Sequence, residues 1–252
     1  SEEITLAQIL KQAGYRTGHF GKWHLGAVKQ DSPLNPNRMG FDEYLSHDNF
    51  FEMDPPLSRN GAPPEIIKGE SSEIVVAEAV NFTRKVQAEG KPFFVVIWFG
   101  SPHGPYSGKP EDVALYSKVP NEDMRPRFAE ITAMDRAIGT YRQALRSLGV
   151  ADTTLLWFNS DNGIPIPNEQ DSFNGGWRGT KGTVYEGGLR VPLIVAGPGI
   201  AADKRSDAMC YLFDVMPTLG KLCGVATPQG SNGREFASVR KDPAQPGRPF
   251  LM

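Results

Sequence analysis

The chain has 252 residues, of which 39% are hydrophobic and 22% are charged, and its formal net charge is −2. This composition is typical of a globular protein with one large α/β domain or two small ones. The balanced charge, without a run of Lys or Arg, excludes the usual signature of a protein that binds nucleic acid or a membrane surface. The longest apolar run, FFVVIWF at residues 93–99, is too short to span a bilayer.

Helical and extended patterns alternate along the sequence. We predict helices over about 1–14, 72–89, 125–148 and 212–224. Three apolar runs predict interior strands at 93–99, 153–158 and 191–196. Residues 29–70 are rich in Pro, Asn, Gly and Ser and predict a long irregular excursion. The alternation indicates a single α/β domain over residues 1–252, with a mostly parallel central sheet and helices on both faces.

Apolar spacing predicts which face of each long helix is buried. In the second helix the buried stripe is Val75, Ala79, Phe82 and Val86. In the third helix the inward residues are expected to be Phe128, Ile131, Ile138, Leu145 and Leu148.

The stretch GYRTGHFGKWHLGAV, residues 14–28, places a lysine and a histidine two residues apart. In an extended segment Lys22 and His24 would project from the same face, while Trp23 and Leu25 would point into a core. Such a segment would hold a cation and an imidazole side by side. The alternative is a half-buried edge strand with a solvated polar face.

More polar side chains follow the predicted strands. His103 comes directly after the strand at 93–99, and Asp161 and Asn162 come directly after the next strand. Lys181 lies in the glycine-rich loop that follows. Ligands of open α/β sheets bind beyond the carboxyl ends of the strands, so we expect these residues to converge with Lys22 and His24 in one cleft.

The residue types suggest a chemistry for this cleft. Lysines and imidazoles suit a tetrahedral oxyanion, and Asp and Asn oxygens suit a hard divalent cation. Simpler explanations remain for each motif: SPHGP could order a proline-rich turn, and SDNG is a common turn sequence. GTKGT fails the Walker pattern because Thr180 precedes Lys181. His19 is expected to be structural, and His47 is a weaker candidate for substrate contact.

Taken together, these stretches resemble the sulfatase family of the alkaline-phosphatase-like superfamily. GYRTGHFGKWHLG is similar to the second signature of that family. The motifs MGFDEY, SPHGPY, SDNG, GTKGTVYEGGLRVPLIVAGPG and DVMPTL follow in the family's order. The resemblance covers nearly the whole chain.

The resemblance implies roles for the candidate residues in cleaving a sulfate ester. Lys22 and Lys181 would bind sulfate oxygens, and His24 would contact the hydroxyl of the nucleophile. His103 would protonate the leaving oxygen. Asp161 and Asn162 would ligate one calcium ion, the implied cofactor.

Two family features are missing from this sequence. The nucleophile of the family is a formylglycine made from the Cys or Ser of a C/S-x-P-x-R motif, and no such motif occurs here. Neither Cys210 nor Cys223 has Pro two residues further on. The paired aspartates that supply further calcium oxygens are also absent. We therefore expect a central fragment, without the nucleophile motif and the C-terminal subdomain, and inactive by itself.

Two alternatives to a sulfatase stay open. One is a metal-dependent phosphodiesterase or phosphomutase of the same superfamily, although four histidines are few for two zinc sites. The other is a non-catalytic sulfate-binding pseudoenzyme. The expected partner is a sulfated small molecule or glycan, with no nucleic acid and no membrane span. The resemblance implies a periplasmic, secreted or lysosomal location.

Overall fold

The computed structural model describes residues 3–49, 51–165 and 175–236. Its residues group into two compact units, Ser1–Val150 with Leu219–Ser231 and Ala151–Thr218 with Asn232–Met252. The prediction of one domain over residues 1–252 stays a prediction.

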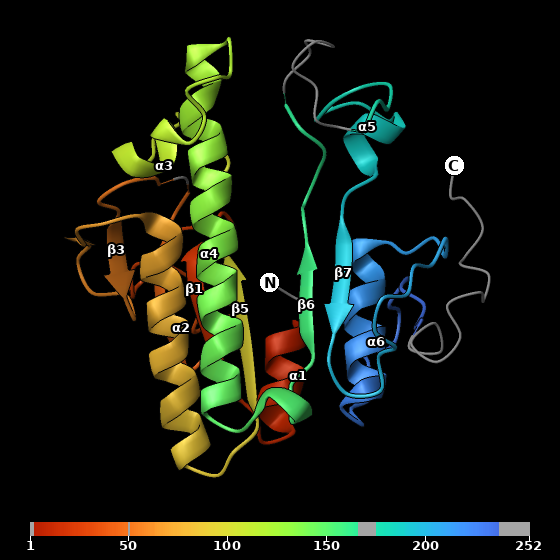
Figure 1. The fold of residues 1–252 in the computed structure, drawn as a ribbon. Coiled ribbons are helices and arrows are strands. Elements are labelled where there is room, and N and C mark those ends of the chain that lie inside the picture. Colours follow the sequence, from red (N-terminus) through yellow and green to blue (C-terminus); the bar gives the residue numbers. More distant parts are fainter. Residues whose placement is uncertain (1–2, 50, 166–174, 237–252) are drawn as a thin grey trace. The chain divides into compact units, whose positions relative to one another are not determined.

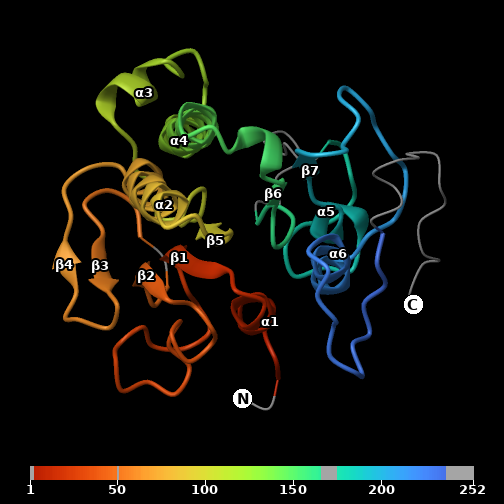
Figure 2. The same ribbon diagram turned by 90° about the horizontal axis from the view of Figure 1, so that it is seen from below.

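The first unit is built on a mixed sheet (Figure 1), whose strand order is β4-β3-β2-β1-β5 (Figure 2). Its strands are β1 (Arg16–Lys22), β2 (Glu43–His47), β3 (Pro56–Arg59), β4 (Glu65–Ile66) and β5 (Phe93–Trp98). The interior strand β1 pairs in parallel with β2 on one side and β5 on the other, whereas β3 and β4 are antiparallel. The α/β class is confirmed, with a parallel centre in a mixed sheet.

One expectation for this sheet was wrong. The excursion at 29–70 contains β2, β3 and β4, of which β3 and β4 form a short antiparallel margin that accommodates polar and proline residues. The apolar run 93–99 forms the strand β5 as predicted. Among the described residues β5 pairs with β1 on one side, and its residues are half-buried or exposed, so its interior position stays a prediction. The position of GYRTGHFGK is not an edge, since β1 lies between β2 and β5.

Helices cover both faces of the sheet, as predicted (Figure 2). On one face α2 (Ser71–Ala88) packs against β1 and β5, and α4 (Arg125–Ser147) packs on α2. On the other face lies α1 (Leu6–Gln12), whose N-terminus is capped by the Thr5 side chain and Gln8. The unit also contains α3 (Pro110–Ala114) and a 3₁₀ turn at Glu122–Met124.

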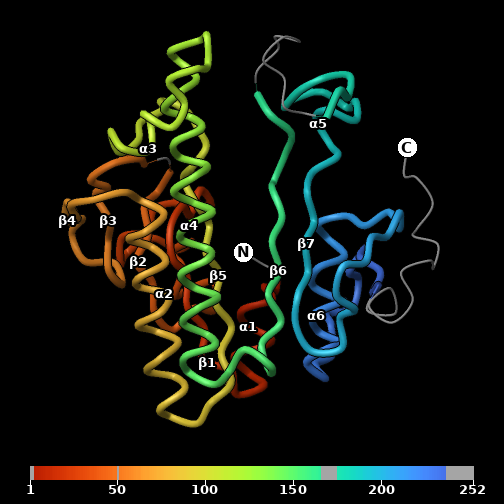
Figure 3. Tube along the Cα trace, viewed as in Figure 1, coloured from red at the N-terminus to blue at the C-terminus, as the bar shows by residue number. Residues whose placement is uncertain are grey.

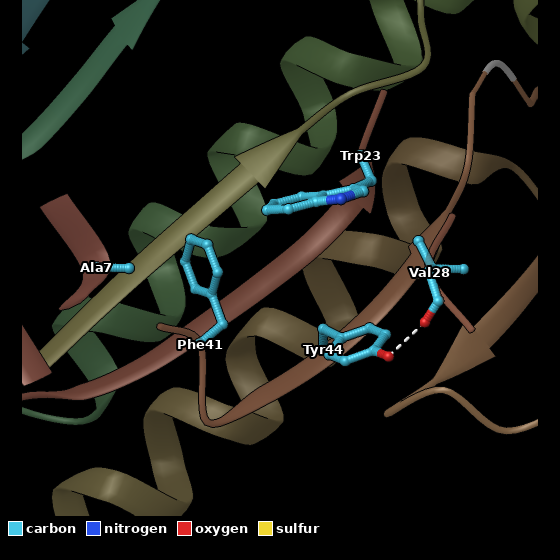
Figure 4. Packing of buried hydrophobic residues seen from close by; sticks show 5 residues of the cluster. All are labelled: Ala7, Trp23, Val28, Phe41 and Tyr44. Atoms are coloured by element: carbon cyan, nitrogen blue, oxygen red, sulfur yellow. Dashed lines mark hydrogen bonds between the residues drawn. The ribbon is translucent and has the colours of Figure 1, made fainter. Parts of the chain in front are cut away.

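A hydrophobic cluster fills the space under α1 and the excursion. It comprises Ala7, Trp23, Val28, Phe41 and Tyr44 (Figure 4). Two polar atoms of this cluster are satisfied by backbone carbonyls of the segment between β1 and β2: Trp23 Nε1 donates to the Leu34 carbonyl over 2.8 Å, and the Tyr44 hydroxyl donates to the Val28 carbonyl. This segment is therefore fixed against the end of β1.

His19 belongs to the same core. It has no exposed surface, and its ring packs edge-on against Trp23, Phe41 and Trp98. Its Nδ1 lies 2.8 Å from Ser46 Oγ on the neighbouring strand. This environment supports the structural role expected for His19.

The buried face of α2 is as predicted, whereas that of α4 is only partly so. Leu145 is buried as predicted, but Ile131 is 37% exposed. The other buried residues of α4 are mostly charged or small: Arg127, Ala129, Glu130, Ala133, Ala137 and Tyr141. Small residues let α4 approach α2 closely, and Tyr141 bonds to Thr83 across that contact over 2.9 Å.

The second unit contains a two-stranded ladder of β6 (Leu156–Asn159) and β7 (Leu193–Ala196), which run side by side in Figure 3. The strands are antiparallel. Its helices are α5 (Glu186–Leu189), 3₁₀ turns at Ala151–Thr153 and Leu212–Asp214, and the start of α6 (Val215–Leu222). The strand predicted at 191–196 is present as β7. Within the part of the chain that the structure describes it pairs with β6 alone, and Leu193 and Ile194 are 40% and 61% exposed, so its predicted interior position is not confirmed.

Candidate functional site

The carboxyl ends of three strands of the first unit meet at one edge of the sheet. The last residue of β1, Lys22, pairs with His47 at the end of β2. The residue before it, Gly21, pairs with Trp98 at the end of β5. Lys22 and His47 are both half-buried. This edge is where parallel α/β sheets bind their ligands.

His24 is held just beyond β1 by a change of backbone conformation. Its φ is 52°, in the left-handed region, and its N–H donates to the Asp48 carbonyl over 2.9 Å. Asp48 Oδ1 accepts a further hydrogen bond from Val28 N. The His24 side chain is exposed.

The expectation that Trp23 and Leu25 both face the core was half right. Trp23 is 2% exposed, but Leu25 is 54% exposed. The reason is that β1 ends at Lys22, so the strict alternation of an extended chain does not continue through His24.

His103 lies in the loop that follows β5. Its N–H bonds to the Gly100 carbonyl over 3.2 Å, and its ring Nδ1 lies 2.8 Å from the Gly104 carbonyl oxygen. Because a carbonyl oxygen only accepts, Nδ1 carries the hydrogen. The ring is thereby oriented through Nδ1, and in the neutral imidazole Nε2 is the acceptor nitrogen.

Two acidic residues near this loop were not anticipated from the sequence. Burial raises the pKa of Glu52, while the charge of His103 acts in the opposite direction. Glu130 on α4 is 1% exposed, and burial raises its pKa to about 8. The Ser107 N–H donates to Glu130 Oε1 over 2.7 Å and opposes this shift. The sequence signal for Glu130 was its spacing, because it shares the helix face of Ala133 and Ala137, which is buried in α4.

The second unit holds the other candidate residues on two loops tied by backbone hydrogen bonds. Asp161 and Asn162 follow β6, and Gly163 N donates to the Gly188 carbonyl over 2.9 Å. Lys181 N donates to the Ile164 carbonyl over 2.8 Å. A Cβ on Gly163 would lie 1.8 Å from the Gly187 carbonyl oxygen, so only glycine permits this close approach.

The Asp161–Asn162 pair offers oxygen ligands of the type that calcium prefers. Asp161 is exposed, and Asn162 Nδ2 donates to the Gly163 carbonyl, which leaves Oδ1 as the acceptor of that amide. Calcium takes about six to eight oxygens. Within the described residues no group of three His, Cys, Asp or Glu side chains is placed to hold a metal. The pair therefore fits as part of a calcium site and does not complete one.

The two cysteines are free thiols. Burial, together with the charge of Asp214, raises the pKa of Cys210 to about 11. A thiol with that pKa is protonated at neutral pH and is a poor nucleophile.

The structure thus gathers the candidate residues into two sets. The first set belongs to the first unit and follows the carboxyl ends of β1, β2 and β5; it comprises Lys22, His24, His103 and His47. Asp161, Asn162 and Lys181 lie on joined loops of the second unit. Convergence of the two sets in one cleft stays a prediction, because the sets belong to different units.

The chain is similar in sequence to known sulfatases. An ulvan-active sulfatase from Formosa agariphila is 29% identical over 96% of the chain and 51% of its own length. Human N-acetylgalactosamine-6-sulfatase is 31% identical over 90% of the chain and 46% of its own length. The chain spans about half the length of these curated relatives.

A solved structure is similar over the same region. The crystal structure of Ps i-CgsB in complex with k-i-k-neocarrahexaose matches with a TM-score of 0.85 and 27% identity, over 93% of this chain and 56% of the other. The family model named Sulfatase matches residues 1–225. The chain therefore belongs to the sulfatase family.

Proposed function

We propose that the protein containing this chain hydrolyses a sulfate ester of a sulfated sugar, with aryl sulfates as a second substrate class. The observation that carries the proposal is the family match over residues 1–225, joined to the placement of Lys22, His24 and His103 at one sheet edge. The names of the relatives support a glycan: one sulfatase is active on ulvan, another acts on N-acetylgalactosamine 6-sulfate, and a similar structure was solved with a neocarrahexaose.

In this proposal the cationic residues bind the sulfate group. Lys22 at the end of β1 and Lys181 on the glycine-rich loop contact its non-bridging oxygens. Charge on these oxygens is stabilised by cations that are fixed before the reaction begins. His24 contacts the nucleophile's hydroxyl.

His103 acts as the general acid. The overall reaction consumes one water and yields the sugar alcohol and hydrogen sulfate. When the bond between sulfur and the bridging oxygen breaks, its electron pair stays on that oxygen, and His103 Nε2 delivers the proton. The Gly104 carbonyl, 2.8 Å from Nδ1, keeps the other ring nitrogen protonated and the ring oriented. A general acid contributes about 10²–10⁴-fold in rate.

Asp161 and Asn162 are proposed as ligands of one calcium ion. Such an ion, when bound, lowers the energetic cost of bringing an anionic ester into the site. The remaining oxygens are expected from parts of the protein outside this chain.

The nucleophile is proposed to be a formylglycine that also lies outside these residues. No C/S-x-P-x-R motif occurs in the chain, and Cys210 is protonated at neutral pH. We therefore expect the chain alone to turn over no sulfate ester, even with calcium. The proposed location, periplasmic, secreted or lysosomal, rests on family membership.

The test is a substrate panel applied to the complete protein. Sulfated oligosaccharides, 4-nitrophenyl sulfate and bis(4-nitrophenyl) phosphate are compared with and without calcium. Calcium-dependent release of sulfate supports the proposal. Preference for the phosphate diester, or binding of sulfated sugar without turnover, contradicts it and favours the phosphodiesterase or the pseudoenzyme. Calcium-dependent turnover by the isolated chain would show that the nucleophile lies within it.

A further inference from the structure

The loop that carries His103 is docked on α4 at one defined place. Its Ser107 N–H donates to Glu130 Oε1 over 2.7 Å. At the next residue, a Cβ on Gly108 would lie 2.7 Å from the Ala129 Cβ, so the loop backbone touches the helix directly. On the same side of α4, the Arg127 guanidinium lies 5.7 Å from the centre of the Tyr106 ring. Three successive loop residues thus contact one turn of α4.

The Glu130 carboxylate sits in a region closed to solvent. Glu130 is 1% exposed and Arg127 is 4% exposed. The charged groups that act on Glu130 are Glu52 from the excursion, Glu70 at the N-terminus of α2, and Arg127 one turn earlier on α4. Glu52 in turn feels the charge of His103. Glu52 therefore interacts electrostatically with both Glu130 on α4 and His103 on the loop.

We propose that Glu130 is a positioning residue for His103, because its hydrogen bond to Ser107 N fixes the loop that carries the imidazole on α4. The inference rests on the proposed role of His103 as general acid. A proton donor must lie within hydrogen-bond reach of the leaving oxygen, and a displacement of about 1 Å costs on the order of 10²-fold in rate. The His103 ring is itself bonded to Gly104, three residues before Ser107, so a shift of the loop moves the ring with it.

The chemistry of Glu130 suits a fixed anchor. Burial and two nearby carboxylates raise its pKa to about 8, so it is mostly a neutral acid at pH 7. A neutral carboxyl group still accepts the Ser107 hydrogen bond through its carbonyl oxygen. Glutamine has the same acceptor in the same place, whereas methionine fills the volume without it. Glu130→Gln and Glu130→Met therefore separate the hydrogen bond from the packing.

The experiment uses these two variants in the complete protein. The matched control is Tyr141→Phe, which removes another buried hydrogen bond of α4, the one to Thr83. With a sulfated sugar, Glu130→Met should lower kcat by about 10–100-fold, because a displaced general acid loses part of its contribution to the rate. With 4-nitrophenyl sulfate, whose leaving group needs little protonation, the loss should stay within about threefold. KM should change little, and Glu130→Gln and Tyr141→Phe should behave like the wild type.

Hydrogen exchange of peptides within residues 100–109 provides a readout that does not depend on catalysis. Glu130→Met should speed exchange there, while Glu130→Gln and Tyr141→Phe should not. If Glu130→Met does not fold, Ser107→Pro removes the same hydrogen bond from the loop side and replaces it in both measurements. The variant that lacks this hydrogen bond decides the inference. The inference is overturned if that variant exchanges at the wild-type rate, or if it loses equal activity on both substrates. If the wild type hydrolyses no sulfate ester, the proposed function fails, and the exchange data still decide whether Glu130 anchors the loop.

Discussion

Lys22 and His47 are paired across β1 and β2, each at the last position of its strand. Side chains at paired positions of neighbouring parallel strands project from the same face of the sheet. The proposed sulfate-binding lysine therefore has an imidazole as its neighbour. The His47 ring is oriented in turn, because Nδ1 accepts a hydrogen bond from Asn49 N over 3.1 Å and Nε2 carries the hydrogen.

This pairing predicts a substrate-binding role for His47. In His47→Asn, the shorter amide can still accept from Asn49 N, but the donor at Nε2 is lost. We expect KM for a sulfated sugar to rise by about tenfold, the effect of one lost hydrogen bond to a charged group, with kcat nearly unchanged. Steady-state kinetics on the complete protein measure this. An unchanged KM would leave His47 without a role in substrate binding.

The role of His103 predicts a dependence on the leaving group. Replacing His103 with Ala should slow hydrolysis of a sugar sulfate by about 10²–10⁴-fold. The loss should be far smaller for 4-nitrophenyl sulfate, because nitrophenolate carries negative charge well without a proton. A series of aryl sulfates of graded leaving-group pKa would show a steeper slope in the variant. Parallel lines for variant and wild type would remove His103 from the acid role.

The Asp161 carboxylate predicts how firmly calcium is held. In Asp161→Asn the ligand keeps one oxygen and loses its charge, so the calcium Kd should rise by about tenfold or more. Calcium content after dialysis and the calcium dependence of turnover measure the change in the complete protein. Asp152→Asn, at an exposed position of the same unit, is the matched control. Equal calcium affinity in both variants would exclude Asp161 as a ligand.

The raised pKa of Glu130 predicts a pH dependence of stability. Its pKa rises from 4.5 to about 8 on folding, so between these values the folded state binds more protons than the unfolded state. Stability from this group is complete below about pH 4.5 and is lost as pH rises toward 8. At about 1.4 kcal/mol per unit, the loss is on the order of a few kcal/mol.

Thermal unfolding of the wild type and Glu130→Gln from pH 5 to 9 tests this. The variant has no titrating group at this position. The difference between its Tm and the Tm of the wild type should therefore shift in favour of the variant as pH rises. Glu122→Gln, at an exposed position near the start of the same helix, should show no such trend. A constant difference between Glu130→Gln and wild type would mean that Glu130 is ionised throughout.

The fold could be predicted where apolar spacing is regular. The stripe of Val75, Ala79, Phe82 and Val86 predicted α2 and its buried face correctly, because all four of these apolar positions are buried. The same method was only partly right on α4, where Leu145 is buried as predicted but the buried face also includes Arg127 and Glu130. Hydrophobic periodicity assigns charged residues to solvent, and only the tertiary contacts of the loop with the helix reverse that assignment.

The sequence proposes the residues of the candidate site but not their geometry. The motif around Lys22 and His24 marked the end of a strand, yet the left-handed turn at His24 breaks the alternation that placed Leu25 in the core. A single positive φ at a non-glycine residue has no reliable sequence signal. Glu52 and Glu130 belong to no recognisable sequence motif, and only the structure places their carboxyl groups beside the His103 loop.

The buried imidazole of His19, on the interior strand β1, makes the stability of the folded state depend on pH in the acid range. Burial lowers the pKa of His19 from 6.5 to about 3, so the folded protein stays unprotonated there while the unfolded chain takes up a proton. As pH falls from 6.5 toward 3, that proton favours the unfolded state. His19 lies on β1, three residues before Lys22, and acidification therefore weakens the strand that supports the proposed sulfate contact.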